Sequence, residues 1–104
     1  MFDKQKVAVV TGGGRGIGKA IALEFARSGY RVAVVSEMES EVEKVRKKCT
    51  EEGVEALALT VDVRNEEAVR RMVAETVERL GSLDIMITSA GVIDLVPVAE
   101  TSIG

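Results

Sequence analysis

The stretch VAVVTGGGRGIG at residues 7–18 decides the fold of this chain. Its first part, Val7 to Thr11, is a short continuous apolar run, which suits a strand buried on both faces better than a half-exposed strand. The glycines that follow favour a tight turn. The next apolar residues recur every four positions, at Ile17, Ile21 and Phe25, and this spacing predicts a helix that packs one face. The chain therefore opens with a strand, a glycine-rich turn and a helix.

The same unit repeats along the chain. We predict further strands at Arg31 to Ser36, Ala56 to Val61 and Asp84 to Thr88, and helices that end at Gly29, Gly53 and Gly81. Asn65 is a fitting N-cap for the third helix. The buried sides of the second and third helices are expected at Val42, Val45 and Cys49, and at Val69, Val73, Thr76 and Leu80. Strands that alternate with helices require right-handed crossovers, so we predict a parallel α/β sheet with strand order 3-2-1-4.

The end of the chain does not continue this pattern. After Gly91 it passes through Pro97, and residues 100–104 resemble the cap of a helix that has no body. The sheet is therefore expected to be truncated after the fourth strand. Leu83 to Thr88 would then be an unpaired apolar edge, which predicts a homo-oligomer in which this edge meets a second copy.

Length and composition limit the possible functions. With 104 residues the chain is expected to form a single domain, residues 1–104. The 14 basic and 17 acidic residues give a net charge of −3 without a basic cluster, which argues against a nucleic-acid partner. Cys49 is the only cysteine and histidine is absent, so a disulfide within the chain and the usual zinc sites are excluded. We find no signal peptide or membrane span and expect a soluble, cytoplasmic protein.

The glycine turn indicates a phosphate site, because such a turn brings a pyrophosphate close to a helix N-terminus. One alternative is a P-loop, since Gly13 to Lys19 has the spacing of glycine, four residues and Gly-Lys. Ala20 stands where that motif needs a hydroxyl for magnesium, which speaks against it. The other alternative is a turn that needs glycine only for its shape.

Three short motifs occur in a fixed order: TGGGRGIG at 11–18, Asp62-Val63, and Ala90-Gly91 after the fourth predicted strand. In this combination the chain resembles the short-chain dehydrogenase/reductase family over its whole length. The resemblance implies a Rossmann-like sheet and an oxidoreductase that transfers hydride between a nicotinamide cofactor and an alcohol or carbonyl substrate.

The resemblance also implies roles for the glycine turn. Gly12, Gly16 and Gly18 would shape the turn around the pyrophosphate. Ile17 would lie close to the ribose on the nicotinamide side, and Thr11 would brace the loop. The turn would therefore hold the centre of the dinucleotide.

Further residues are implied on the adenosine side. Asp62 would accept a hydrogen bond from the adenine amino group, Val63 would offer its backbone, and Ala90-Gly91 would line the adenosine ribose. The alternative for Asp62 is a loop carboxylate that caps local amides. The chain departs from the family at Thr88-Ser89, where Asn-Asn is usual, so we expect a weaker brace or altered cofactor contacts there.

The choice between NAD and NADP depends on charge at the end of the second strand. Here the pair is Ser36-Glu37, and Glu37 would repel a 2′-phosphate but could accept from a ribose hydroxyl. Arg15 stands where some NADP-dependent members of the family keep a basic residue, although it could equally be a solvated charge. We favour NAD over NADP.

Catalytic groups are missing from the sequence. The family uses a serine, a tyrosine and a lysine four residues after that tyrosine, whereas the only tyrosine here, Tyr30, has Val34 at that spacing. We therefore assign no catalytic residue. Two classes remain: the cofactor-binding portion of an oxidoreductase, or a nucleotide-binding or folding fragment with no activity of its own.

Overall fold

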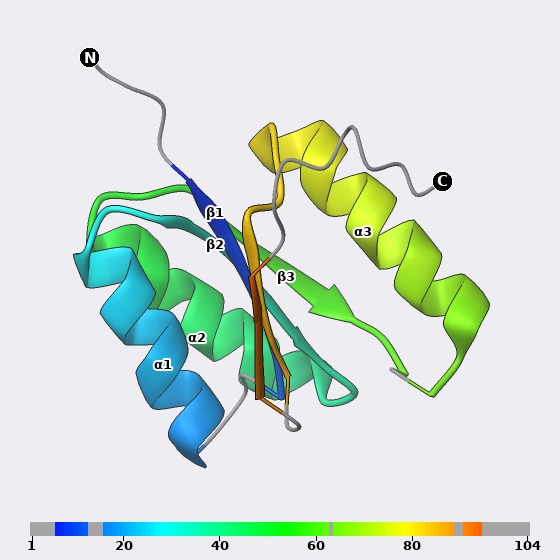
Figure 1. Ribbon diagram of the computed structural model, residues 1–104. Coiled ribbons are helices and arrows are strands. Elements are labelled where there is room, and N and C mark those ends of the chain that lie inside the picture. The colour runs from blue at the N-terminus through cyan, green and yellow to red at the C-terminus, as the bar shows by residue number, and fades with distance from the viewer. Residues whose placement is uncertain (1–5, 13–15, 63, 89–90, 95–104) are drawn as a thin grey trace.

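The computed structural model describes residues 6–12, 16–62, 64–88 and 91–94. Within them the elements are β1 (Val7–Thr11), α1 (Gly16–Arg27), β2 (Arg31–Ser36), α2 (Glu39–Glu51), β3 (Ala56–Thr60), α3 (Glu66–Leu80), β4 (Ile85–Thr88) and β5 (Gly91–Asp94). One sheet forms the middle layer, with α1 and α2 on one face and α3 on the other (Figure 1). The predicted strands and helices are confirmed, and two strands are one residue shorter than predicted, since β3 ends at Thr60 and β4 begins at Ile85.

The strand order is β3-β2-β1-β4-β5, and the first four of these strands are parallel. The predicted order 3-2-1-4 is therefore confirmed. The chain builds outward from β1 to β3 and then returns across β1 to place β4 on its other side. This reversal lies between β1 and β4, where parallel α/β sheets form a ligand crevice at the carboxyl ends of their strands.

Two apolar clusters lie on opposite faces of the sheet, because successive strand residues alternate between the faces. Val10, Val32 and Val34 belong to the cluster on the side of α1 and α2, together with the predicted Val42, Val45 and Cys49. Val7, Val9, Ala33 and Val35 belong to the cluster that contains Met72 and Leu80 of α3. The continuous apolar runs of β1 and β2 thus have the burial on both faces that their sequences predict.

The third helix has the caps that its sequence predicts. The Asn65 side chain accepts a hydrogen bond from the Ala68 N–H at 3.0 Å. At the other end Gly81 has φ 97°, and its N–H donates to the Val77 carbonyl. Its buried side differs in part from the prediction, because Met72 is buried with Thr76 and Leu80 while Val69 and Val73 are only half-buried.

The prediction that the fourth strand is an unpaired edge is wrong. Residues 91–94 form β5, which pairs with β4 in antiparallel register, from Thr88 opposite Gly91 to Ile85 opposite Asp94. Val92 and Ile93 are β-branched and favour extended backbone, and the pairing satisfies the N–H and C=O groups that β4 would otherwise expose. The sheet therefore continues for one strand beyond the predicted truncation. Pro97 and residues 100–104 lie outside the described residues.

Candidate functional site

The candidate site begins at the glycine turn between β1 and α1. Gly12 and Gly16 have left-handed backbone conformations, with φ of 71° and 62°. Residues with a Cβ rarely adopt such angles, so glycine is needed at both positions although open space surrounds each of them. The Gly12 N–H donates to the Val35 carbonyl at 2.7 Å, which fixes the start of the turn against β2.

The N-terminus of α1 differs from those of α2 and α3. The first turns of α2 and α3 each carry two glutamates, at Glu39 and Glu41 and at Glu66 and Glu67. Carboxylates there are favoured by the positive end of the helix dipole. The first turn of α1 contains no acidic residue. Among the three described helices, α1 is therefore the one whose N-terminus carries no carboxylate of its own. A site that binds an external phosphate at a helix N-terminus needs this arrangement.

A cavity of about 310 Å³ lies between the ends of β1 and β4, beside the start of α1. It is lined by Thr11, Gly12, Ile17, Gly18, Ile21, Ile87 and Thr88. Ile17 is 79% exposed, an unfavourable position for a large apolar side chain unless a ligand covers it. The Thr11 hydroxyl donates to the Ile87 carbonyl at 3.3 Å, so it ties β1 to β4 beside the cavity.

Polar and charged groups meet at the ends of β2 and β3. The Val61 N–H donates to the Ser36 carbonyl at 3.0 Å, which holds the two strand ends together. The Ser36 hydroxyl accepts from the Met38 N–H at 3.1 Å and so shapes the turn that carries Glu37. The exposed carboxylate of Glu37 projects from this turn and lies 3.8 Å from the Arg64 guanidinium.

Asp62 makes the local contacts that the alternative interpretation of this residue predicts. Its Oδ1 accepts from the Arg64 backbone N–H and from Arg64 Nε, both at 3.0 Å, and its Oδ2 accepts from Arg64 Nη2 at 3.2 Å. Hydrogen bonds from the Arg64 side chain and backbone hold the pKa of the Asp62 carboxyl below its ordinary value. Asp62 is therefore ionised at neutral pH and remains an acceptor.

Comparison with known proteins identifies the family. Residues 6–103 match the family described as short chain dehydrogenase. The chain is 42% identical over 89 residues to General stress protein 39 of Bacillus subtilis, covering 85% of this chain and 31% of that protein. It is 39% identical over 95 residues to a sorbitol dehydrogenase of Cereibacter sphaeroides, covering 91% of this chain and 36% of that protein. The chain belongs to the short-chain dehydrogenase family.

Solved structures of the family have the same fold. An NAD⁺-bound xylitol dehydrogenase superposes with a TM-score of 0.75 and 38% identity, covering 78% of this chain and 31% of that one. An alcohol dehydrogenase from Thermococcus sibiricus, complexed with 5-hydroxy-NADP, also has a TM-score of 0.75 and 38% identity, over 80% and 36% of the two chains. The present chain thus spans about a third of the length of these relatives and corresponds to their N-terminal, cofactor-binding part.

The structure brings together some of the residues that the short-chain dehydrogenase resemblance implies. Gly12, Ile17 and Gly18 line the cavity, and Gly16 forms the turn beside it. Ser36, Glu37 and Asp62 lie at the adjoining strand ends. Gly91 opens β5 and pairs with Thr88 of β4. Three further residues of the predicted site lie outside the described residues, namely Arg15, Val63 and Ala90, and so does Ser89, where the chain departs from the family.

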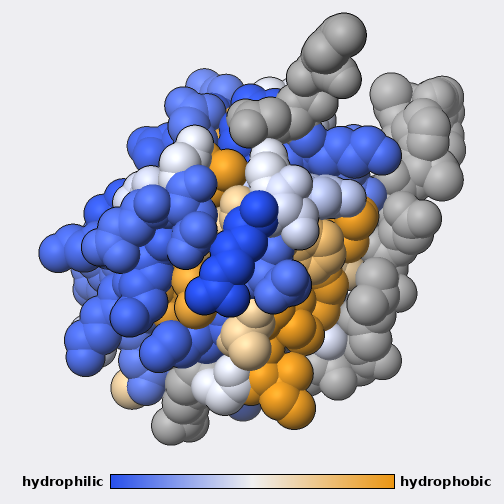
Figure 2. All heavy atoms as spheres, turned by 90° about the vertical axis from the view of Figure 1, so that its left-hand side faces the viewer, coloured by the Kyte–Doolittle hydropathy of each residue, from blue (hydrophilic) through white to orange (hydrophobic). Residues whose placement is uncertain are grey.

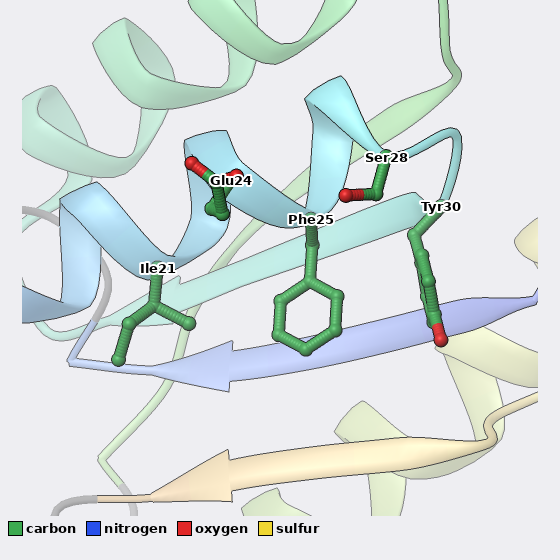
Figure 3. Close-up of a pocket in the computed structure, with 5 residues that line it drawn as sticks. All are labelled: Ile21, Glu24, Phe25, Ser28 and Tyr30. Carbon is green, nitrogen blue, oxygen red and sulfur yellow. The ribbon is translucent and has the colours of Figure 1, made fainter.

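A second, apolar pocket of about 340 Å³ lies further along α1 and is lined by Ile21, Glu24, Phe25, Ser28 and Tyr30. Ile21, Phe25 and Tyr30 point toward the strands beneath the helix (Figure 3). The rings of Phe25 and Tyr30 meet edge to face with centroids 4.8 Å apart. Tyr30 is thus a packing residue away from the glycine turn.

No metal site or membrane span is found in the part of the chain that the structure describes. Its acidic and cysteine side chains form no cluster of three or more that could hold a metal ion. None of the described helices is both long and apolar enough to cross a bilayer.

The sequence did not single out Arg64, which links the two carboxylates of the site. An isolated arginine before a helix cap is usually a solvated charge, so its role becomes visible only when the ends of β2 and β3 are brought together. The sequence also did not single out Ile87 of β4, which lines the cavity because the order β1-β4 places it beside the glycine turn together with Thr88.

Proposed function

We propose that this chain is the NAD(P)-binding portion of an oxidoreductase that transfers hydride between a nicotinamide cofactor and an alcohol or carbonyl substrate. The observation that carries the proposal is the glycine turn with two left-handed residues, which leads into a helix N-terminus without carboxylates beside a cavity. The names of several relatives, sorbitol dehydrogenase and 3-oxoacyl-[acyl-carrier-protein] reductase among them, support this reaction class.

Each group of residues would contribute a different part of cofactor binding. The amides at the start of α1 would bind the pyrophosphate, and Gly18 would allow its close approach to the helix. The side chain of Ile17 is exposed at the start of α1, and it would pack against the ribose on the nicotinamide side of the cofactor. When bound, the nicotinamide supplies the hydride chemistry, while this chain fixes its position and excludes water from one side.

The adenosine end would lie over the ends of β2 and β3. Glu37 would accept a hydrogen bond from the ribose 2′-hydroxyl, and Asp62 would accept from the adenine amino group. Arg15, Val63, Ala90 and Gly91 are proposed to complete this side of the site. We propose NAD as the preferred cofactor over NADP, because the Glu37 carboxylate opposes a 2′-phosphate.

The proposal covers residues 1–104 as a single dinucleotide-binding domain of a cytoplasmic, homo-oligomeric enzyme without a nucleic-acid or membrane partner. The substrate groups and the serine, tyrosine and lysine of the family would come from the remaining two thirds of a longer parent. A second candidate function is a nucleotide-binding fragment without activity of its own. It is favoured by the only tyrosine of the sequence, Tyr30, which packs on Phe25 and is therefore not placed to act as the catalytic tyrosine of the family.

Titration of the 104-residue chain with NADH, followed by cofactor fluorescence, tests the proposal. We expect saturable binding that Gly18→Val weakens by about 100-fold or more, because a branched side chain would fill the approach to the helix. Ala74→Val, which adds the same side chain to an exposed position of α3, is the matched control and should bind as the wild type does. Equal binding by Gly18→Val and wild type, or no binding by wild type, would refute the proposal. Turnover of an alcohol or ketone panel by the chain alone would exclude the inactive-fragment alternative.

A further inference from the structure

A guanidinium lies between the two carboxylates at the ends of β2 and β3. Arg64 Nη2 is 3.2 Å from Asp62 Oδ2 and 3.8 Å from Glu37 Oε2. Arg64 Nε and the Arg64 backbone N–H both donate to Asp62 Oδ1. The bidentate contact with Asp62, together with the backbone hydrogen bond two residues along the chain, gives the guanidinium a defined direction that an isolated surface ion pair lacks.

These contacts leave free acceptor capacity at the site. A carboxylate offers about four acceptor positions, and Arg64 occupies three of those on Asp62. The remaining position is on Oδ2, which accepts one hydrogen bond from Arg64. Glu37 interacts with Arg64 through charge alone, because 3.8 Å is too long for a hydrogen bond. Among the described residues, both carboxylates keep acceptor positions that Arg64 does not occupy, and the Glu37 and Asp62 carboxyl groups also lie close enough to interact with each other.

The guanidinium also changes the electrostatics of the adenosine end. Two carboxylates alone would carry a charge of −2, whereas two carboxylates and one guanidinium carry −1. Arg64 is 81% exposed, so its donors are accessible to a ligand that approaches the strand ends. A phosphate placed beside Glu37 would lie near both the opposing carboxylate and this cation, so the repulsion by Glu37 is partly offset.

We propose that Arg64 is a specificity-determining residue that lets this site accept a 2′-phosphate as well as a 2′-hydroxyl. This inference rests on the proposed function, since it assigns the adenosine end of a dinucleotide to the ends of β2 and β3. Arg64 reduces the penalty that Glu37 imposes on NADP, and its hydrogen bonds orient the Asp62 carboxylate. The site is thus dual in specificity, with a modest preference for NAD.

Titration of NADH and NADPH against three forms of the 104-residue chain tests this role. We expect Arg64→Gln to weaken NADPH binding by about threefold to tenfold, the size of an exposed charge interaction, and to leave NADH binding within about twofold. Arg79→Gln removes the same charge from the last turn of α3, where Arg79 pairs with Glu75, and should change neither affinity. Arg64→Gln that weakens both cofactors equally, or neither, overturns the inference.

A measurement without cofactor tests the ion cluster of Glu37, Asp62 and Arg64 separately from cofactor binding. Carboxyl ¹³C titration by NMR should show that the pKa of Asp62 rises toward its ordinary value in Arg64→Gln and stays lowered in Arg79→Gln. The same spectra show whether each variant is folded. An Asp62 pKa that is unchanged in Arg64→Gln contradicts the ion cluster itself and overturns the inference at its origin. If the wild type binds neither cofactor, the proposed function is refuted and this inference with it. If Arg64→Gln still binds NADH and the ratio of its NADPH affinity to its NADH affinity equals that of the wild type, only this inference is refuted.

Discussion

The β2 strand and the β4 strand have similar sequences but different surroundings. Both are short apolar runs, RVAVVS and IMIT. The four central residues of β2 are buried, with α1 and α2 over one face and α3 over the other (Figure 1). In β4 only Ile87 is buried, and Ile85, Met86 and Thr88 are half-exposed.

The difference shows that an apolar run in the sequence does not by itself predict how deeply a strand is buried, because burial also depends on which elements cover the strand. The described elements contain no helix beyond α3 that could cover β4 as α1 and α2 cover β2. Viewed from the side of α1 and α2, the largest hydrophobic area lies at the lower right of the molecule, and smaller hydrophobic areas lie between hydrophilic side chains on the rest of this face (Figure 2). Since the chain spans about a third of its relatives, we propose that the rest of a longer parent covers this side of the sheet.

The strongest test of the comparison places a charge in each strand. Val34→Asp would bury an unpaired carboxylate in the covered cluster and should destabilise the chain by more than about 4 kcal/mol, enough to unfold a small domain. Met86→Lys lies at a half-exposed position that packs only partly against the α3-side cluster, and it should cost less, about 1 to 2 kcal/mol. Urea denaturation followed by circular dichroism measures both. Similar losses in the two variants would mean that β4 is as closely covered as β2.

A cysteine on each side of the sheet measures the same difference kinetically. Cys49 is fully buried, and burial followed by the nearby Glu52 carboxylate raises the pKa of its thiol to about 11. Because the thiolate is the reactive form, Cys49 should react with an aromatic disulfide reagent at pH 8 about 100-fold more slowly than an exposed thiol. A cysteine introduced by Met86→Cys in a Cys49→Ala background should react close to the rate of the unfolded chain. Fast labelling of native Cys49 would contradict the packing of α2 on α1.

These contrasts explain how much could be predicted from the sequence. Strands with continuous apolar runs and helices with clear caps follow local rules, so β1, β2 and the Asn65 cap were predictable. The strand at 91–94 was not predictable, because four residues that begin with a glycine carry little signal until β4 offers them an edge. The burial of Met72 does not follow from the sequence, because the apolar spacing fits Val69 and Val73 equally well and the position of α3 on the sheet decides which side faces inward.

The candidate site divides in the same way. The glycine turn is encoded locally, so Gly12 and Gly16 could be named from the motif. The partners of Glu37 depend on how β2 and β3 align. The contact between Glu37 and Arg64 could not be predicted without that pairing. Cavity residues on β4 likewise required the strand order.

Self-association offers a third, smaller test of the exposed side. The edge of β4 is paired with β5, but the half-exposed faces at Leu83, Ile85 and Met86 keep an apolar surface that a second copy could bury. We expect concentration-dependent association in sedimentation velocity, weakened about tenfold or more by Met86→Lys, since one buried methionine contributes roughly 1.5 to 3 kcal/mol. Ala74→Lys adds the same charge to the exposed face of α3 and should leave association unchanged. A monomer at high micromolar concentration would show that this apolar surface does not drive association.

The smallest expected effect concerns Glu37, which follows directly on the covered strand β2. The Ser36 carbonyl and hydroxyl are both hydrogen-bonded, so Glu37→Gln should remove a charge without moving the turn. Loss of the carboxylate relieves the repulsion of a 2′-phosphate, and we expect NADPH to bind about threefold to fivefold more tightly while NADH binds slightly more weakly. Glu78→Gln on the exposed last turn of α3 is the matched control, because it changes the net charge equally at the opposite end of the strands.

The effect of Glu37→Gln on NADPH binding should diminish as salt rises from about 20 to about 300 mM, because the Debye length falls from about 20 Å to a few ångströms in that range and exposed charges are screened. An unchanged ratio of NADPH to NADH affinity would mean that the adenosine ribose lies away from β2, and that the charge at this strand end has no part in choosing the cofactor.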